Sequence, residues 1–274
     1  MSHNGLFSLT KLEYNPLGHG TLKDQSSLSI SAFFPAYNDG RTIGPLVRAA
    51  AKILRSLNAD FEVVVVDDGS RDDTAAVLRK LKREIPELVS IHHVSNRGYG
   101  GALISGFHSC TKEWIFYTDG DGQYGVDEIL ALLREAGAEV DVVNGYKISR
   151  SDPFYRVWLG KIYRLGMRCA FGLKITDVDC DYRLMRRGIF DQIRLQCSSG
   201  VICVELMKKI EHAGYKVVEV PVHHYPRPHG DSEFFRVRHL SRVFLQLISL
   251  WVRLVLLRRY HDKAWLAAKE APTE

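Results

Sequence analysis

Two aspartates separated by one glycine, Asp119 and Asp121, end an apolar run in the sequence TDGDGQ (118–123). Carboxylate oxygens are the ligands that Mg²⁺ and Mn²⁺ prefer, and proteins often hold these ions with one or two carboxylates and the phosphates of a substrate. The pair therefore predicts a Mg²⁺ or Mn²⁺ site that stabilises the negative charge of a diphosphate leaving group. A short acidic turn after a strand, with no ligand, is the alternative interpretation of these two residues taken alone.

Other acidic residues follow apolar runs in the same way. They are Asp39, the adjacent Asp67 and Asp68, and the later Asp177, Asp179 and Asp181. Gathering so many carboxylates in one place is unfavourable unless cations neutralise them, because like charges oppose each other's ionisation. The set therefore favours a site that binds a metal ion and phosphate over a series of unrelated turns.

The elements that must position these acids alternate along the chain. We expect strands at 28–34, 61–66, 88–95, 113–118, 139–149 and 215–225, and helices at 42–57, 74–85, 100–110 and 126–136. Apolar strands that alternate with helices predict an α/β fold with a mostly parallel central sheet and helices on both faces. The carboxyl ends of parallel strands form the ligand-binding edge of such a sheet, so the acids would meet there. From Arg150 onward we expect mainly helix.

Six motifs carry a resemblance to a known family. They are PAYNDG (35–40), VVDDGS (65–70), NRGYGGAL (96–103), TDGDGQ (118–123), ITDVDCDYRLMRR (175–187) and GYKVVEVPVHHYPRPHGDSEF (214–234). Their order and spacing resemble family 2 glycosyltransferases with the GT-A fold. The last two resemble motifs of the dolichyl- or polyprenyl-phosphate glycosyltransferases, a branch similar to dolichyl-phosphate mannose synthase. Two residues depart from that branch. It usually has Gly at the position of Asp181 and often Lys at the position of Glu233, so both departures add negative charge near the expected phosphate.

The resemblance implies a metal-dependent, inverting transfer of sugar from a UDP- or GDP-linked donor to a polyprenyl or dolichyl phosphate. The donor-binding residues that it implies are Pro35, Tyr37, Asp39, Asp68, Asp119, Asp121 and Gln123, and the catalytic residues are Asp177, Arg183 and Arg227. A phosphate monoester with a second pKa of about 6 is largely ionised at neutral pH and needs little base catalysis. We therefore expect Arg183 or Arg227 to hold the acceptor phosphate and Asp177 to orient it. The alternative is that Arg183 pairs structurally with Asp177 or Asp181.

The chain divides into an N-terminal extension (1–27), a GT-A catalytic domain (28–235) and an amphipathic C-terminal helical segment (236–274). In the last segment, apolar residues follow helical spacing among several arginines; they are Phe244, Leu247, Ile248, Trp251, Leu254 and Val255. This pattern predicts a helix that lies in a membrane interface. Packing of the helix on its own domain, or on a partner subunit of a homo-oligomer, is the alternative. The apolar stretch is shorter than the ~18 to 20 residues of a spanning helix, so contact with the membrane would be peripheral.

Composition narrows the remaining function classes. The five cysteines are scattered and form no CxxC pair, which argues against a disulfide framework and a zinc site and predicts a cytoplasmic protein, with the cytoplasmic face of the membrane as its place of action. We expect no secretory leader.

The motifs also narrow the enzyme classes. No GxGxxG follows the first expected strand, which excludes a dinucleotide dehydrogenase. A nucleotidyltransferase, a glycosyltransferase with a non-lipid hydroxyl acceptor and a non-catalytic sugar-nucleotide-binding module stay as alternatives. The arginines suit phosphates and lipid headgroups better than nucleic acid.

Overall fold

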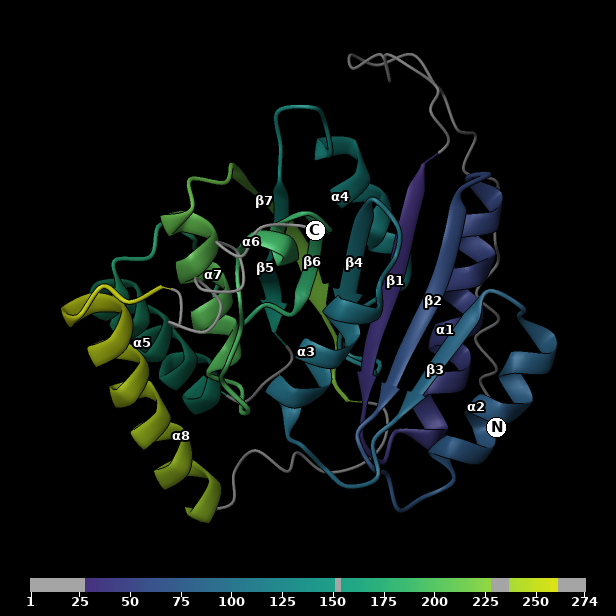
Figure 1. Cartoon of the computed structure of the whole chain (residues 1–274), viewed down its shortest axis with the longest axis horizontal. Coiled ribbons are helices and arrows are strands. Elements are labelled where there is room, and N and C mark those ends of the chain that lie inside the picture. The colour runs from purple at the N-terminus through teal and green to yellow at the C-terminus, as the bar shows by residue number, and fades with distance from the viewer. Residues whose placement is uncertain (1–27, 151–153, 228–236, 261–274) are drawn as a thin grey trace, which may run out of the picture.

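A computed structural model describes residues 28–150, 154–227 and 237–260. The predicted extension over 1–27 and Glu233 lie outside these ranges. A seven-stranded sheet runs through the molecule with helices on both of its faces (Figure 1). The strands are β1 (Ser29–Ala36), β2 (Asp60–Asp67), β3 (Leu88–His92), β4 (Trp114–Thr118), β5 (Val142–Arg150), β6 (Tyr182–Arg186) and β7 (Val217–His224). The helices are α1 (Gly40–Ser56), α2 (Thr74–Glu84), α3 (Tyr99–Ser109), α4 (Ile129–Glu135), α5 (Phe154–Phe171), α6 (Ile189–Gln192), α7 (Ile202–His212) and α8 (Val237–Trp251).

The strand order is β3-β2-β1-β4-β6-β5-β7, and only β6 runs antiparallel to its neighbours. The mostly parallel sheet predicted from the sequence is therefore confirmed. β6 itself was not predicted, because Arg183 interrupts its apolar pattern and the sequence around it was expected to be helical. Since β6 runs in the opposite direction, its amino end lies at the carboxyl edge of the other strands. This reversal brings the acidic segment 177–181 to the same edge as Asp119 and Asp121.

Two hydrophobic cores lie on opposite faces of the sheet. Successive residues of a strand point to opposite faces, so Phe34 packs under α1, α2 and α4, whereas Phe33 packs under α3 and α7 (Figure 1). The four consecutive valines of β2 are all buried, as expected for a parallel strand covered on both sides. The close approach of α3 requires Gly106, where an added Cβ would lie 2.0 Å from the Phe33 ring.

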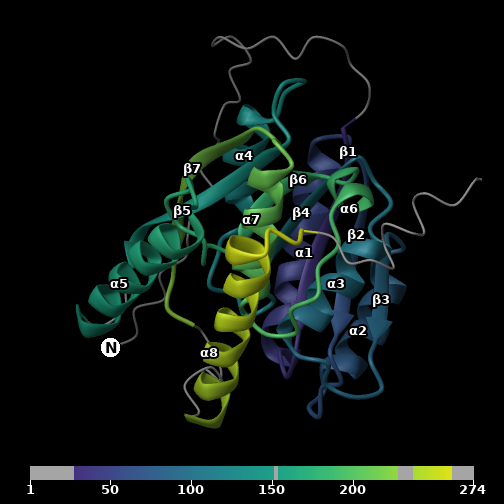
Figure 2. The ribbon, with the colours of Figure 1, turned by 60° about the vertical axis from the view of Figure 1, so that its left-hand side comes forward.

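The C-terminal helix α8 continues into a π-helical turn, η3 (Val252–Leu256), and lies beside α7 and α5 (Figure 2). Leu250 and Leu254 are buried against the domain, and the indole of Trp251 donates a hydrogen bond to the carbonyl of Ala170 at 2.9 Å. The predicted apolar stripe divides between two faces, because Phe244 and Ile248 point outward and are exposed. Among the residues that the structure describes, no helix is long and apolar enough to span a bilayer.

Candidate active site at the carboxyl edge of the sheet

The turn after β4 places the two candidate metal ligands against the end of β1. The amide of Gly120, between Asp119 and Asp121, donates to the carbonyl of Pro35 at 3.2 Å. A Cβ at Gly120 would lie 2.6 Å from the same carbonyl oxygen, so the glycine permits this close approach. The hydroxyl of Thr42 donates to the carbonyl of Gly120 at 2.8 Å from the other side. Pro35 therefore contributes through its backbone, which anchors the acidic turn.

Asp119 lies among other acids in a buried setting. Burial raises the pKa of its carboxyl well above the ordinary value, and the nearby Asp181 and Asp121 raise it further. The hydroxyl of Tyr99 donates to Asp119 Oδ1 at 2.7 Å and opposes part of this rise. A cation beside the carboxylates would remove the electrostatic cost of their shared ionisation.

The chemistry of these donors fits a hard divalent ion that also binds a substrate. Within residues 28–150, 154–227 and 237–260, no three His, Cys, Asp or Glu side chains converge to hold a metal ion by themselves. Two carboxylates are enough when phosphate oxygens and water complete the coordination, as is usual for Mg²⁺. Asp119 and Asp121 are therefore suited to an ion that arrives with a diphosphate.

The segment after β7 crosses the acidic turn. Arg227 Nη2 donates to Asp121 Oδ2 at 2.8 Å, and the Gln123 amide donates to Asp121 Oδ1 at 3.0 Å. The side-chain amide of Gln123 donates to the carbonyl of Tyr225 at 3.1 Å, and the Tyr225 amide donates back to the carbonyl of Gln123 at 2.8 Å. Two candidates far apart in the sequence, Gln123 and Arg227, thus lie together at the site.

Asp39 lies in the same electrostatic environment. Burial raises the pKa of its carboxyl to about 6, the Tyr37 amide opposes this rise, and the charges of Asp121 and Arg227 act in opposite directions. That amide donates to Asp39 Oδ2 at 2.9 Å, and the Tyr37 side chain is half-buried. The structure therefore brings Asp39 together with Asp121 and Arg227, and its donor-binding role stays a prediction.

Asp68 is held differently from the other donor candidates. Its carboxylate accepts hydrogen bonds from the amides of Arg97 at 2.8 Å and Gly98 at 2.9 Å, and it contacts His93 Nδ1 at 2.6 Å. Both oxygens are thus bound within the protein, and the residue is buried. Asp68 fixes the glycine-rich loop before α3, and this observed role competes with the predicted contact to the nucleoside.

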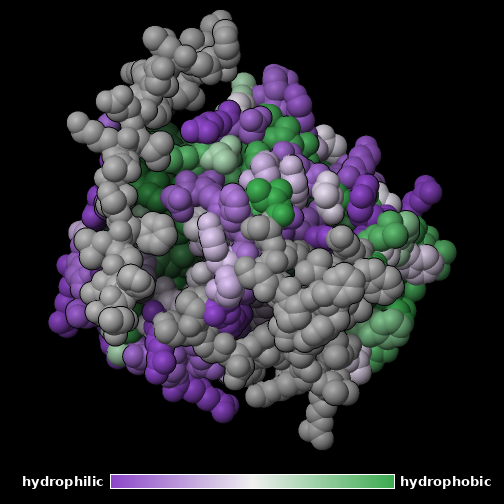
Figure 3. All heavy atoms as spheres, turned by 180° about the vertical axis from the view of Figure 1, so that it is seen from behind, coloured by the Kyte–Doolittle hydropathy of each residue, from purple (hydrophilic) through white to green (hydrophobic). Residues whose placement is uncertain are grey.

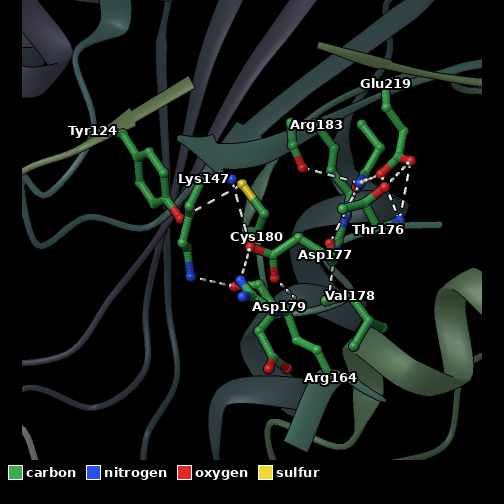
Figure 4. Close-up of polar contacts among 12 residues, drawn as sticks. Tyr124, Lys147, Arg164, Thr176, Asp177, Val178, Asp179, Cys180, Arg183 and Glu219 are labelled. Carbon is green, nitrogen blue, oxygen red and sulfur yellow. Dashed lines mark hydrogen bonds and ion pairs between the residues drawn. The ribbon is translucent and has the colours of Figure 1, made fainter. Parts of the chain in front are cut away.

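Asp177 and a group of cations form a second part of the edge (Figure 4). The carboxylate is buried, and Arg164 Nη1 of α5 donates to its Oδ2 at 3.0 Å. Lys147 Nζ donates to the carbonyl of Asp179 at 2.7 Å. An open cavity of about 230 Å³ adjoins these groups, lined by Tyr146, Lys147, Arg164, Leu165, Arg168, Thr176 and Asp177. Three basic side chains around one cavity suit an anionic ligand.

Arg183 has no exposed surface, which contradicts the expectation that it holds the acceptor phosphate. Its guanidinium donates to Asn144 Oδ1 at 2.7 Å, to the carbonyl of Val178 at 2.6 Å and to the Tyr117 hydroxyl. It also forms an ion pair with Asp181 at 3.4 Å. The structural alternative holds for the pair with Asp181, while Asp177 pairs with Arg164 instead.

Sequence reasoning missed several residues of the edge: Tyr99, Lys147, Arg168 and Thr176. The signal for Lys147 was available, because it lies near the carboxyl end of an expected strand, where ligand-binding residues gather. Tyr99 lies between two glycines at the start of α3, and only the tertiary structure shows that its hydroxyl reaches Asp119. Arg168 and Thr176 line the same cavity only because the end of α5 lies beside the segment before β6.

The sequence that forms this site matches a known protein family over most of the domain. The family model for glycosyl transferase family 2 matches residues 31–194. The chain belongs to this family. The family 2 match includes Asp39, Asp119, Asp121 and Asp177, and it ends before β7 and Arg227.

Individual proteins show the same similarity. The undecaprenyl-phosphate 4-deoxy-4-formamido-L-arabinose transferase of Pseudomonas fluorescens is 31% identical over 218 residues, which are 78% of this chain and 63% of that protein. A Salmonella choleraesuis protein of the same name is 30% identical over 229 residues, or 82% of the chain and 66% of that protein. The chain thus spans less than two thirds of the length of these relatives.

Solved structures show the fold. Glucosyl-3-phosphoglycerate synthase of Mycobacterium tuberculosis, in complex with Mn²⁺, UDP and glucosyl-3-phosphoglycerate, matches with a TM-score of 0.60 at 17% identity, covering 82% of this chain and 79% of that one. Mannosyl-3-phosphoglycerate synthase of Rubrobacter xylanophilus matches with a TM-score of 0.62 at 17% identity, covering 86% and 77%. The architecture is therefore GT-A-like, as predicted.

Proposed function

We propose that this protein transfers a sugar from a nucleoside-diphosphate donor to a polyprenyl or dolichyl phosphate at a membrane surface. The observation that carries the proposal is the proximity of an acidic site and a basic cavity. Lys147 lines the cavity, and its charge also acts on both Asp119 and Asp179. Two anions, one at the carboxylates with a metal ion and one at the basic side chains, would therefore meet next to Lys147.

The roles of the residues follow from where charge develops. Cleavage of the anomeric C–O bond builds negative charge on the departing diphosphate. Asp119 and Asp121 would hold Mg²⁺ or Mn²⁺, which supplies positive charge to that diphosphate when bound. Arg227 is half-exposed beside Asp121 and is the arginine of the predicted pair that can reach a phosphate. We assign the diphosphate side of the site to Arg227.

The acceptor side needs cations more than a base. Lys147, Arg164 and Arg168 would draw the acceptor phosphate towards the donor, and the planar guanidinium groups suit its oxygens. Asp177 is buried and already paired with Arg164, so it would fix the position of that guanidinium. This arrangement supports an orienting role for Asp177, since the phosphate nucleophile is already ionised.

Exposed apolar side chains beside the cavity support a lipid acceptor. Leu165 of α5 lines the cavity and is 62% exposed, and Ile162 is exposed one turn away. Further exposed apolar residues lie on the C-terminal helix α8, namely Phe244, Leu245 and Ile248, and at the end of the following turn η3, namely Leu256 and Leu257. Hydrophobic side chains gather on the side of the molecule that carries α5 and α8 (Figure 3). The names of the P. fluorescens and S. choleraesuis relatives, undecaprenyl-phosphate transferases, support the same acceptor class.

The test is release of nucleoside diphosphate from a panel of UDP- and GDP-sugars, with Mn²⁺ or Mg²⁺, in the presence and absence of a short polyprenyl phosphate. We expect release that requires both the metal and the lipid phosphate. If a soluble sugar hydroxyl supports release equally well, the acceptor is a hydroxyl compound and not a lipid phosphate. Binding of a nucleotide sugar without release under any condition would favour the non-catalytic module.

Replacing Arg168 with glutamine should raise the KM for polyprenyl phosphate about tenfold, because one of three cations around the cavity is lost. The KM for the donor should stay within twofold. Arg168 is exposed, so the substitution leaves the core intact and the buried pair of Arg164 and Asp177 in place. The matched control is Arg83→Gln on the exposed face of α2. If the KM of Arg168→Gln for the lipid phosphate is unchanged, the acceptor phosphate does not bind in this cavity.

Replacing Leu245 with serine should weaken binding to membranes, because Leu245 is 65% exposed on the outer face of α8. Loss of one buried leucine costs about 1.5–3 kcal/mol, or roughly tenfold or more in the partition coefficient. The measurement is co-flotation with vesicles that contain anionic lipid. Val94→Ser is the control, since Val94 is fully exposed after β3, the strand at the edge of the sheet that lies away from α8 (Figure 1). Equal loss in both variants would argue against α8 as the membrane contact.

A further inference from the structure

We infer that the C-terminal helix α8 holds the donor carboxylate Asp119 in position, through the loop 196–199 and Tyr99. The inference rests on the proposed function, in which Asp119 binds the donor through a metal ion. It makes Arg253 and Gln246 positioning residues that act on the site from outside it, through Tyr99, which contacts Asp119 directly. The linkage consists of three successive sets of contacts.

The first set joins α8 and η3 to the loop. Gln246 of α8 accepts a hydrogen bond from the Ser199 hydroxyl at 2.5 Å and donates to the Ser198 hydroxyl at 3.2 Å. Arg253 of η3 donates to the side-chain oxygen of Gln196 and to Glu205 Oε1 at 2.9 Å. The two residues thus hold the loop from both of its ends.

The second set fixes the same loop from inside the domain. Glu205 of α7 is fully buried, and its Oε2 accepts hydrogen bonds from the amides of Gln196 at 2.9 Å and Cys197 at 2.8 Å. Its Oε1 pairs with Lys209 at 2.9 Å and with Arg253. Burial opposes the ionisation of Glu205, but the Lys209 ammonium and the two amides outweigh it and lower the pKa of this carboxyl. A buried carboxylate with four partners is a rigid anchor, and Arg253 is the partner contributed by the C-terminal segment.

The third set connects the loop to the active site. The carbonyl of Ser198 accepts a hydrogen bond from the Gly100 amide at 3.0 Å. The contact is so close that a Cβ at Gly98 would lie 2.4 Å from the Ser198 oxygen, and a Cβ at Gly100 would lie 2.0 Å from the Cys197 oxygen. Tyr99 lies between these two glycines, and its hydroxyl donates to Asp119 Oδ1 at 2.7 Å. The backbone that carries Tyr99 therefore rests directly on the loop that Gln246 and Arg253 hold.

Two readouts test the linkage. The first is the dissociation constant of UDP, and of GDP, from the protein in the presence of Mn²⁺. It is measured for the wild type, Tyr99→Phe, Arg253→Gln and the double variant. We expect each single change to weaken binding about fivefold to tenfold, and the double variant to bind no worse than Tyr99→Phe alone, because both changes interrupt one path. Multiplied effects in the double variant would overturn the inference.

The second readout is amide hydrogen exchange of the peptide that covers 98–103, which needs no ligand. Exchange should be at least about tenfold faster in Arg253→Gln and in Gln246→Ala, because the Gly100 hydrogen bond to Ser198 opens more often. Gln246→Ala removes a half-exposed side chain, so it keeps the test valid if Arg253→Gln does not fold. Arg55→Gln, which breaks the exposed pair with Glu87, is the matched control.

The two readouts separate the inference from the proposed function. Faster exchange at 98–103 without binding of either nucleotide by the wild type would contradict the proposed donor and leave the mechanical linkage in place. Unchanged exchange in both variants, with normal nucleotide binding, would overturn the linkage and leave the proposed function intact.

Discussion

Replacing Asp119 with asparagine is expected to lower metal-dependent release of nucleoside diphosphate by about a thousandfold or more. Loss of the charge that holds a catalytic metal removes several kcal/mol of transition-state stabilisation, and each 1.36 kcal/mol is about a factor of ten in rate. Asparagine keeps the oxygen that accepts the hydrogen bond from Tyr99. The substitution therefore removes the negative charge of Asp119 and preserves its shape and its main contact.

Stability provides an independent check of the same variant. A carboxyl whose pKa is raised in the folded state lowers stability as the pH rises from its unfolded pKa through its folded pKa. The pKa of Asp119 is raised well above its ordinary value, first by burial and then by Asp181 and Asp121. Without a metal ion at neutral pH, Asp119→Asn should therefore be at least as stable as the wild type. Addition of Mn²⁺ with the nucleotide should raise the Tm of the wild type much more than that of the variant.

The control for Asp119→Asn is Asp60→Asn. Asp60 is an exposed carboxylate at the amino end of β2, where it pairs with Lys112 at 2.6 Å. It lies at the opposite edge of the sheet, so turnover and the metal-induced change in Tm should stay at wild-type values. An Asp119→Asn variant that retained most of its turnover would show that this carboxylate is not a metal ligand.

The acidic edge could be predicted because local and global patterns agree there. The apolar strands of β1, β2 and β4 alternate with helices, and a parallel sheet places the ends of these strands at one edge. Asp39, Asp119 and Asp121 follow directly from that rule. Arg227 was predicted by its motif, and its contact with Asp121 at 2.8 Å came only from the structure.

The remaining features depend on contacts that a sequence pattern does not encode. β6 was missed because a five-residue strand with arginines at its second and last positions does not resemble a buried strand. Arg168 and Thr176 share a cavity only because the end of α5 returns to the segment before β6. Tyr99 reaches Asp119 because glycines on both sides allow its backbone to approach the loop at Ser198. Each case is decided by tertiary packing, which local spacing cannot reveal.

Arg183 shows how one motif is compatible with two roles. An arginine that follows acids near a phosphate site suits an anion ligand, and the same arginine suits a buried ion pair. The structure distinguishes the roles by register. Arg183 lies opposite Tyr117 of β4 and Asn144 of β5, and its side chain contacts both of these neighbours. It therefore joins three adjacent strands of the sheet beneath the active site.

Replacing Arg183 with methionine should consequently lower the free energy of unfolding by about 3–5 kcal/mol. The change leaves Asp181 without its cationic partner, and it leaves the oxygens of Asn144 and Val178 without the donors they have now. Buried polar groups that lose their partners carry the full cost of desolvation. The measurement is urea denaturation followed by circular dichroism, with the midpoint and slope compared between wild type and variant.

Arg187→Met is the matched control, because Arg187 lies four residues further along and forms an exposed pair with Asp191 at 3.5 Å. An exposed pair contributes about 0–1 kcal/mol, so this variant should unfold close to the wild-type midpoint. If Arg183→Met were as stable as the control but lost only its dependence on polyprenyl phosphate, Arg183 would bind the acceptor after all. If both stability and turnover fall, and turnover recovers with the folded fraction at lower temperature, Arg183 acts by holding β4, β5 and β6 together. That outcome would leave recognition of phosphate to Arg227 and to the basic side chains of the cavity.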